Sequence, residues 1–98
     1  MVYEVVVQTV DPATRDEYIA AYKKRWREMS LDGWRNGRLL KSVEDPARVI
    51  IVLEWDSVEA HRQHTRGKNP VMTQFMQEVV EKYRSGVSDI DHYTVEDI

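Results

Sequence analysis

The centre of the chain carries an apolar run at residues 49–55, VIIVLEW, that predicts a β-strand because β-branched residues dominate it. Side chains alternate along a strand, so four large apolar residues share one face: Val49, Ile51, Leu53 and Trp55. Ile50 and Val52 lie on the opposite face, and a strand that is apolar on both faces must be covered on both. The chain is too short to supply both covers, so the pattern predicts helices on one face and a second subunit on the other.

Three further segments have the composition of strands and end in turn residues. They are Val2–Val10, Trp34–Val43 and Val87–Val95. The polar stretch at residues 44–48, EDPAR, joins the second predicted strand to the central one, so these two strands should form a hairpin. On the second strand, Trp34, Asn36 and Arg38 are expected to project from one face because they occupy alternate positions.

A helix is predicted between the first two strands. Thr14 and Glu17 have the spacing of a capping box at its start, and Gly33 suits a left-handed turn at its end. Its apolar residues recur at intervals of three and four, at Tyr18, Tyr22, Trp26 and Met29. This periodicity predicts that one side of the helix packs against the sheet.

The second helical region is divided by a glycine at position 67. A short helix should follow Asp56 as its N-cap, with Glu59 at capping-box spacing, and it carries His61 and His64 about one turn apart. Asn69, which precedes a proline, then starts a longer helix that should end near residue 86. The apolar residues of this helix are Val71, Met72, Phe75, Met76, Val79, Val80 and Tyr83.

The order of these elements is β-α-β-β-α-β, which is the ferredoxin-like pattern of an α+β domain. It predicts one domain over residues 1–98, with a four-stranded antiparallel sheet and helices on one face. The apolar residues on the other face indicate a homodimer in which two sheets face one another, as in a dimeric α+β barrel.

Composition excludes several classes of function. The 14 basic and 17 acidic residues are interspersed and the net charge is −3, so nothing favours binding to nucleic acid. The chain has no cysteine and no glycine-rich phosphate loop, so neither a metal site nor a cofactor is expected. No signal peptide and no apolar run of about 20 residues is present, so no membrane association and a cytoplasmic location are expected.

The hairpin and the helix after it, from Asp45 to His64, resemble the antibiotic biosynthesis monooxygenase family of the dimeric α+β barrel superfamily. The resemblance is carried by Asp45-Pro46 at the turn and by Glu54-Trp55, Ser57, Glu59-Ala60 and His64 where strand passes into helix. Asn69-Pro70 and His92-Tyr93 add to it. The resemblance implies a homodimer with a pocket between sheet and helices in each subunit.

The resemblance also implies an activity. Members of the family include cofactor-independent monooxygenases that convert aromatic phenols or anthrones of the polyketide type into quinones. In that reaction a base removes a proton, and the resulting carbanion reacts directly with dioxygen. The wider superfamily adds cyclases, isomerases, haem degraders and proteins without known catalysis, so these functions stay open as alternatives.

Two positions depart from the family pattern. Several quinone-forming members have an asparagine four residues before the tryptophan equivalent to Trp55, and Ile51 stands at that position here. The haem degraders use an asparagine on the first strand, which has none in this chain. The missing amide at position 51 favours a cyclase or isomerase as the alternative to an oxygenase.

Three residues are the predicted catalytic group. His64 is expected to act as general base, because an imidazole titrates near neutrality, and His61 is the second candidate. Trp55 should form an aromatic wall of the pocket. The predicted substrate-binding residues are Ile51, Leu53, Tyr22, Trp26, Phe75, Met72, Asn36, Arg38 and His92. A metal site built from the three histidines is conceivable but has no clear acidic ligand, so none is predicted.

Overall fold

The computed structural model describes residues 1–98, and the predicted ferredoxin-like order of elements is confirmed. The strands are β1 (Val2–Val10), β2 (Trp34–Lys41), β3 (Arg48–Trp55) and β4 (Arg84–Tyr93). The helical elements are η1 (Pro12–Thr14), α1 (Arg15–Arg27), α2 (Val58–Arg62), α3 (Pro70–Phe75), η2 (Met76–Val80) and α4 (Glu81–Tyr83).

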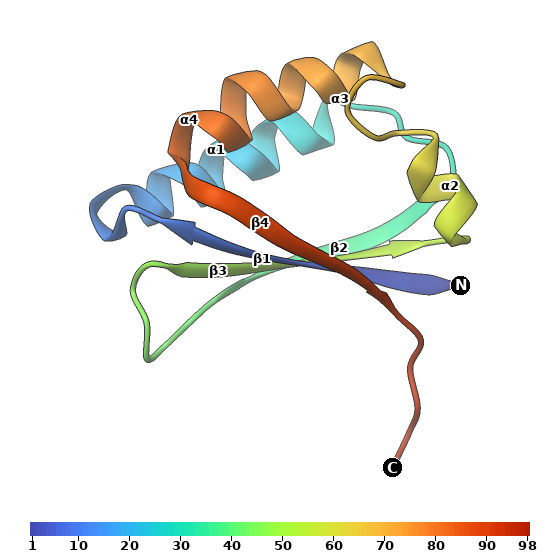
Figure 1. Cartoon of the computed structure of the whole chain (residues 1–98), viewed down its shortest axis with the longest axis horizontal. Coiled ribbons are helices and arrows are strands. Elements are labelled where there is room, and N and C mark those ends of the chain that lie inside the picture. Colours follow the sequence, from blue (N-terminus) through green and yellow to red (C-terminus); the bar gives the residue numbers. More distant parts are fainter.

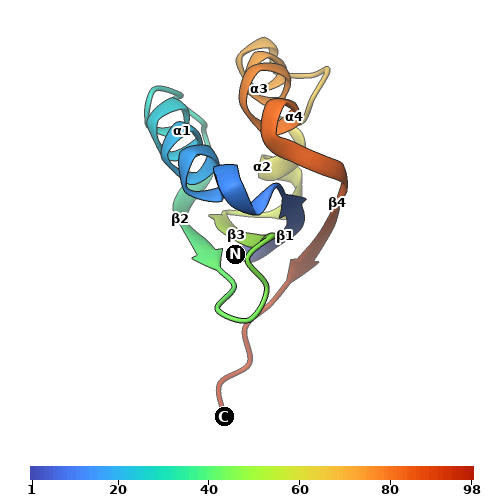
Figure 2. The same cartoon turned by 90° about the vertical axis from the view of Figure 1, so that its left-hand side faces the viewer.

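The four strands form one antiparallel sheet in the order β2-β3-β1-β4. All helices lie on the same face of this sheet, and the segment after β4 leads away from the opposite side (Figure 1). Figure 2 shows α1 above β2 and the α3–α4 region above β4. The molecule therefore has two layers, and one face of the sheet has no cover within the chain.

The core lies between these two layers and contains the predicted face of β3. The side chains of β3 that point into it are all buried: Val49, Ile51, Leu53 and Trp55. Ile50 and Val52 are only half-buried, because they point to the uncovered side. Each large apolar side chain that is fully buried stabilises the fold by about 1.5–3 kcal/mol, so the alternation along β3 decides which face carries the helices.

We use the name open sheet face for the uncovered surface, which is formed by Tyr3, Val5, Val7, Leu40, Ile50 and Val52. These residues are paired across strands, as in Val5 with Val52 and Val7 with Ile50. Val5 and Val7 of β1 therefore point away from the helices. Its core face instead carries two buried polar residues, Glu4 and Gln8, beside Val6 and Val10.

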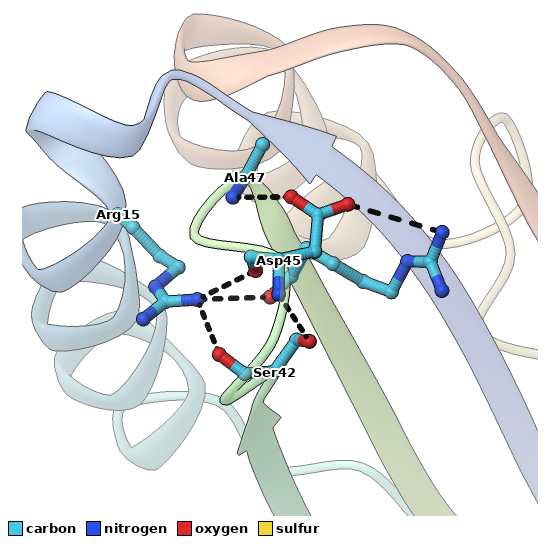
Figure 3. A network of polar contacts seen from close by, with 5 residues as sticks. Arg15, Ser42, Asp45 and Ala47 are labelled. Atoms are coloured by element: carbon cyan, nitrogen blue, oxygen red, sulfur yellow. Dashed lines mark hydrogen bonds and ion pairs between the residues drawn. The ribbon is translucent and has the colours of Figure 1, made fainter.

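The turn between β2 and β3 is fastened to α1 by one arginine (Figure 3). Nη1 of Arg15 donates to the carbonyl oxygens of Ser42 at 3.0 Å, Asp45 at 3.1 Å and Arg48 at 3.4 Å. Within the turn, the Asp45 carboxylate accepts from the backbone N–H of Ala47 at 2.9 Å. The predicted hairpin is confirmed, and a charged donor from α1 adds to the backbone hydrogen bonds that the Asp45 and Arg48 carbonyl groups already accept within the turn.

One of the predicted helix caps is wrong. The short helix α2 is capped by Ser57, whose Oγ accepts from Ala60 N–H at 3.1 Å, while Asp56 pairs with Arg35 instead. Thr14 does occupy the N-cap position of α1, but its side chain forms no cap, and the turn η1 before it is capped by Asp11. In both regions a second capping residue lies close to the predicted one. The N-cap of α3, Asn69, is confirmed.

Some predicted boundaries also differ. β2 ends at Lys41, and β4 begins at Arg84 because Gly86, expected to end the preceding helix, lies within β4 at an irregularity with φ of 72°. The register shifts between Trp34 and Asn36. The Trp34 side chain therefore points to the core face, while Asn36 and Arg38 stay on the open side. The prediction that Trp34, Asn36 and Arg38 share one face is therefore wrong.

Candidate functional site

A cavity of about 120 Å³ lies between the core face of the sheet and the helices. Nine of the predicted site residues line it: Tyr22, Trp26, Ile51, Leu53, Trp55, His61, His64, Met72 and Phe75. Aromatic rings from α1 and α3 pack tightly at its wall, with Tyr22 stacked on Trp26 at 5.5 Å and edge-on to Phe75 at 4.9 Å between ring centroids. The cavity is therefore mostly apolar, with Glu4, His61 and His64 near Trp55 and further polar groups at the opposite end.

A second and larger cavity, of about 410 Å³, adjoins the first between α1 and β2. The two cavities share Tyr22, Trp26, Ile51 and Leu53 as walls. Gly37 on β2 allows Leu53 and Trp34 to pack close to the strand. A Cβ atom at this position would lie 2.9 Å from Cδ2 of Leu53 and 3.4 Å from the Trp34 ring. The larger volume falls within the range typical of small-molecule sites.

The polar centre of the smaller cavity is Glu4, which projects from β1 and is 5% exposed. Nε1–H of Trp55 donates to Oε1 of Glu4 at 3.0 Å, and Nε2 of His61 lies 3.3 Å from the same oxygen. Burial raises the pKa of Glu4 to about 7, and the Trp55 hydrogen bond opposes that rise. The carboxyl group is consequently half-ionised near neutral pH and can accept or release a proton there.

His61 lies between Glu4 and His92. Its Nδ1 is 2.8 Å from Nε2 of His92, so one ring nitrogen contacts each neighbour. Burial, together with the nearby His92, lowers the pKa of His61 to about 4. His61 is therefore neutral at physiological pH, so its contact with Glu4 is not an ion pair between two full charges.

His64 has both ring nitrogens engaged in hydrogen bonds. Nε2 lies 2.8 Å from the carbonyl oxygen of Asp32, which only accepts, so this nitrogen carries the proton. Nδ1 accepts from Nδ2 of Asn69 at 2.8 Å, and the Asn69 oxygen in turn caps α3. The ring is thus a neutral tautomer without a free acceptor, held parallel to Trp55 at 5.7 Å between centroids.

Three predicted site residues do not line the smaller cavity. Asn36 and Arg38 project from the open sheet face, where they lie near Tyr3, Val52 and Glu54, because the register of β2 shifts after Trp34. Arg38 does line the larger cavity, at the side formed by the edge strand β2. His92 lies behind His61, which it meets through the hydrogen bond described above.

Glu4 and Gln8 line the cavity but were not predicted from the sequence as site residues. Gln8 accepts from the Tyr18 hydroxyl and donates to Oγ of Ser88 at 3.1 Å, so its amide is satisfied at the end of the cavity away from Trp55. The available signal was that both residues alternate with Val6 on one face of β1. That signal gives no indication of which face is buried, because Val5 and Val7 make the other face more apolar.

No group of three or more histidine, cysteine, aspartate or glutamate side chains is arranged to hold a metal ion. None of the helices has the length and apolar composition needed to cross a membrane. The expected cytoplasmic location and lack of a cofactor stay predictions.

Comparison with solved structures shows which proteins share this fold. A putative antibiotic biosynthesis monooxygenase from Bordetella bronchiseptica matches with a TM-score of 0.82 and 18% identity, covering 97% of this chain and 96% of that one. A conserved protein from Methanosarcina mazei Go1 matches at 0.77 and 18%, covering 97% and 92%. SnoaB, a cofactor-independent oxygenase from Streptomyces nogalater, matches at 0.65 and 18%, covering 99% and 94%. At these identities the similarity establishes the fold alone.

Comparison by sequence shows the family. A search of curated proteins finds no match. The family described as antibiotic biosynthesis monooxygenase matches residues 1–78, which include β1, the β2–β3 hairpin and all the residues of the cavity except Val80 and Ser88. This family includes monooxygenases. The chain therefore belongs to the antibiotic biosynthesis monooxygenase family.

Proposed function

We propose that the protein is a cofactor-independent monooxygenase acting on an aromatic phenol or anthrone of the polyketide type. The observation that carries the proposal is the buried Glu4 carboxyl group in a largely apolar cavity, hydrogen-bonded to Trp55 and in close contact with His61. A base with a pKa of about 7 suits proton abstraction at neutral pH. The family, and the fold shared with a cofactor-independent oxygenase, support the same reaction class.

In the proposed reaction Glu4 removes a proton from an activated ring carbon, which leaves a delocalised carbanion. The carbanion gives its electrons to dioxygen and forms a C–O bond, so that a peroxide results. Loss of the second proton from the same carbon breaks the O–O bond and yields a carbonyl group and water. A CH₂ group is thereby oxidised by four electrons, and both oxygen atoms of dioxygen are accounted for.

The dimensions of the site bear on how a substrate lies in it. A cavity of about 120 Å³ suits a single aromatic ring, since an apolar cavity of about 150 Å³ binds benzene. The remaining rings of an anthrone would extend past the shared walls into the larger cavity beside α1. The reacting carbon then lies near Glu4, and Trp55 supplies a flat wall against the ring.

A cyclase or isomerase is the second candidate. Ile51 lines the cavity at the position where several quinone-forming members have an asparagine, so no amide is available there to bind an oxygen intermediate. The same base and apolar cavity would serve proton transfer between two carbons of one substrate. This candidate predicts turnover under nitrogen, which the monooxygenase proposal excludes.

We also infer a homodimer formed through the open sheet face. Val5, Val7, Ile50 and Val52 form a continuous apolar surface there, and no element of the chain covers it. Contiguous apolar surfaces of this kind mark sites of association. Because the same face meets itself in a two-fold dimer, one set of residues supplies both sides of the interface.

The test of the proposed base uses oxygen uptake with a panel of anthrones and naphthols. Glu4→Gln should lower turnover by about 100-fold or more, the usual size of a general-base contribution. In the unmodified protein kcat/KM should rise with pH to a plateau, with a midpoint near 7, because only the ionised carboxylate accepts a proton. Glu54→Gln is the matched control, since this carboxylate precedes Trp55 but lies on the open side of the sheet.

His64, the base predicted from the sequence, stays the rival for this role. If Glu4→Gln keeps full turnover while His64→Ala loses it, the base is His64 and the proposal for Glu4 is wrong. If both variants keep full turnover, neither residue acts as the base.

A further inference from the structure

Three polar side chains form a continuous row of close polar contacts from the cavity to the edge of the sheet. Glu4 and His92 are register partners on β1 and β4, and His61 from α2 bridges them. The distances along the row are 3.3 Å from Oε1 of Glu4 to Nε2 of His61, and 2.8 Å from Nδ1 of His61 to Nε2 of His92. Both ring nitrogens of His61 are thus used, one for each neighbour.

Exposure to solvent increases along this row. The Glu4 side chain is 6% exposed and that of His61 is 14% exposed. His92 is half-buried on β4, which forms an edge of the sheet and has no neighbouring strand on its outer side. The other group bonded to Glu4 is the indole of Trp55, which has a single N–H and no acceptor, so it cannot relay a proton.

We propose that His61 and His92 carry protons between Glu4 and solvent. This inference rests on the proposed function, in which Glu4 takes a proton from a substrate that closes the cavity. The row supplies the route by which that proton leaves while the substrate is still bound.

Each transfer breaks one bond to hydrogen and forms another. The protonated Glu4 carboxyl gives its proton to Nε2 of His61, and His61 gives the proton on Nδ1 to Nε2 of His92. His92 then releases the proton on its own Nδ1 to water. Before and after the transfer each contact in the row joins one potential donor to one potential acceptor, so both states leave His61 with a partner on each side.

The environment of His61 suits passing a proton on and does not favour holding an extra one. Trp55 stacks on its ring at 5.1 Å between centroids, and His64 and Arg62 lie nearby. This surrounding disfavours a lasting positive charge on the ring, so a proton that arrives on one nitrogen displaces the proton on the other. His61 and His92 therefore act on the proposed reaction through Glu4. His61 contacts Glu4 directly, and His92 contacts Glu4 only through His61.

The first test needs no substrate and follows the Glu4 side-chain carboxyl by ¹³C NMR near its midpoint of about pH 7. In the unmodified protein the protonated and ionised forms should exchange rapidly and give one averaged signal. His92→Ala should slow this exchange by about tenfold or more, which broadens or divides the signal, and added imidazole should restore it. Asp89→Asn is the matched control, since Asp89 lies on the same strand and its side chain points to the open side.

Restoration by imidazole separates a proton path from a purely structural role, because free imidazole replaces the proton carrier and not the packing. An unchanged signal in His92→Ala would overturn the proposal. So would a broadened signal that imidazole does not sharpen, since that would indicate a change of structure around Glu4.

The second test uses turnover and distinguishes this inference from the proposed function. With a substrate, His92→Ala should lower steady-state turnover by about tenfold and leave the first deprotonation of bound substrate unchanged, with recovery in imidazole buffer. Glu4→Gln should abolish that first deprotonation. If Glu4→Gln is inactive and His92→Ala is fully active, the proton path is wrong and the base stands; if Glu4→Gln is fully active, the base itself is wrong.

Discussion

Glu4 shows how a single residue acquires a chemical property from its surroundings. A glutamate on a strand is ionised at neutral pH when it faces water. Here the strand turns it into the core, and burial raises its pKa to about 7 despite the hydrogen bond from Trp55. The residue opposite in behaviour is His61, whose pKa falls to about 4 in the same environment. One cavity thus holds a carboxyl group that is half protonated near neutral pH and an imidazole that is uncharged there.

Glu4→Gln should change how stability depends on pH. Between pH 4.5 and about 7 the folded state keeps a proton on Glu4 that the unfolded state has lost, so the free energy of unfolding contributed by this group falls as pH rises. Glutamine does not titrate, so the free energy of unfolding of the variant does not fall for this reason. Relative to the unmodified protein, the variant should become more stable between about pH 5 and pH 8, by up to about 3 kcal/mol. Urea denaturation at several pH values measures the difference.

The contribution of His61 has the opposite sign and is common to both proteins. Its pKa of about 4 in the folded state, against 6.5 normally, destabilises the fold as pH falls below 6.5. It therefore cancels when the two curves are subtracted. A difference that does not vary with pH would show that the pKa of Glu4 is not raised, and Glu54→Gln should give such a flat difference.

Trp55→Phe should raise the pKa of Glu4 above 7. The indole N–H stabilises the ionised carboxylate, and phenylalanine keeps an aromatic ring of smaller area but has no donor. A ¹³C titration of the Glu4 carboxyl measures the midpoint directly. Trp26→Phe is the control, since the Trp26 Nε1 has no hydrogen-bond partner and does not touch Glu4. A midpoint that stays at 7 or falls would contradict the assigned role of the Trp55 donor.

At the scale of elements, the five-residue helix α2 depends on contacts beyond its own backbone. A helix of this length is not stable alone. Ser57 caps its start, and shortly after its end His64 links it to Asp32 before β2 and to Asn69 at the start of α3. These bonds hold α2 over Trp55, so that both of its neighbouring imidazoles stack on the indole.

His64→Ala should destabilise the fold by about 1–3 kcal/mol, since two hydrogen bonds are lost and each contributes roughly 0.5–1.5 kcal/mol. Thermal or urea denaturation measures the change. Thr65→Ala is a suitable control, because it removes only one local bond, from its hydroxyl to the Arg62 carbonyl. An effect of His64→Ala no larger than that of the control would show that His64 does not link these segments, and would make its predicted role as base the better explanation of its position.

At the scale of the whole molecule, the two faces of the sheet differ in their cover. One face carries every helix, while the other leaves an apolar surface with no cover from the chain (Figure 2). The free energy falls when a second copy of the chain excludes water from aliphatic side chains on such a surface. The inferred homodimer therefore follows from the distribution of apolar residues between the faces.

Sedimentation should show a dimer at micromolar concentration. The double substitution Ile50→Glu, Val52→Lys should convert it to a monomer. The interface has no groups placed to pair with the new charges, and burying unpaired charges costs several kcal/mol. Val71→Glu is the control, since this exposed valine lies on α3 and away from the open sheet face. A monomer in the unmodified protein, or a dimer that survives the double substitution, would contradict the inferred interface.

The sequence by itself determined the order of elements and the covered face of β3. The reason is local: strand alternation places Val49, Ile51, Leu53 and Trp55 on one side whatever the rest of the chain does. The cap of α3 is equally local, since the Asn69 side chain bonds backbone groups two and three residues away. The aromatic residues of α1 were likewise placed at the cavity by helical periodicity.

Only the tertiary structure decided the polar chemistry of the site. β1 carries apolar residues on both faces, and pairing with β3 and β4 is what turns Glu4 and Gln8 inward. The register shift after Trp34, which keeps Asn36 and Arg38 out of the smaller cavity, depends on the partner strand and has no signal in the local sequence. Glu4, His61 and His92 meet because three distant elements converge, and burial at that point sets their proton affinities.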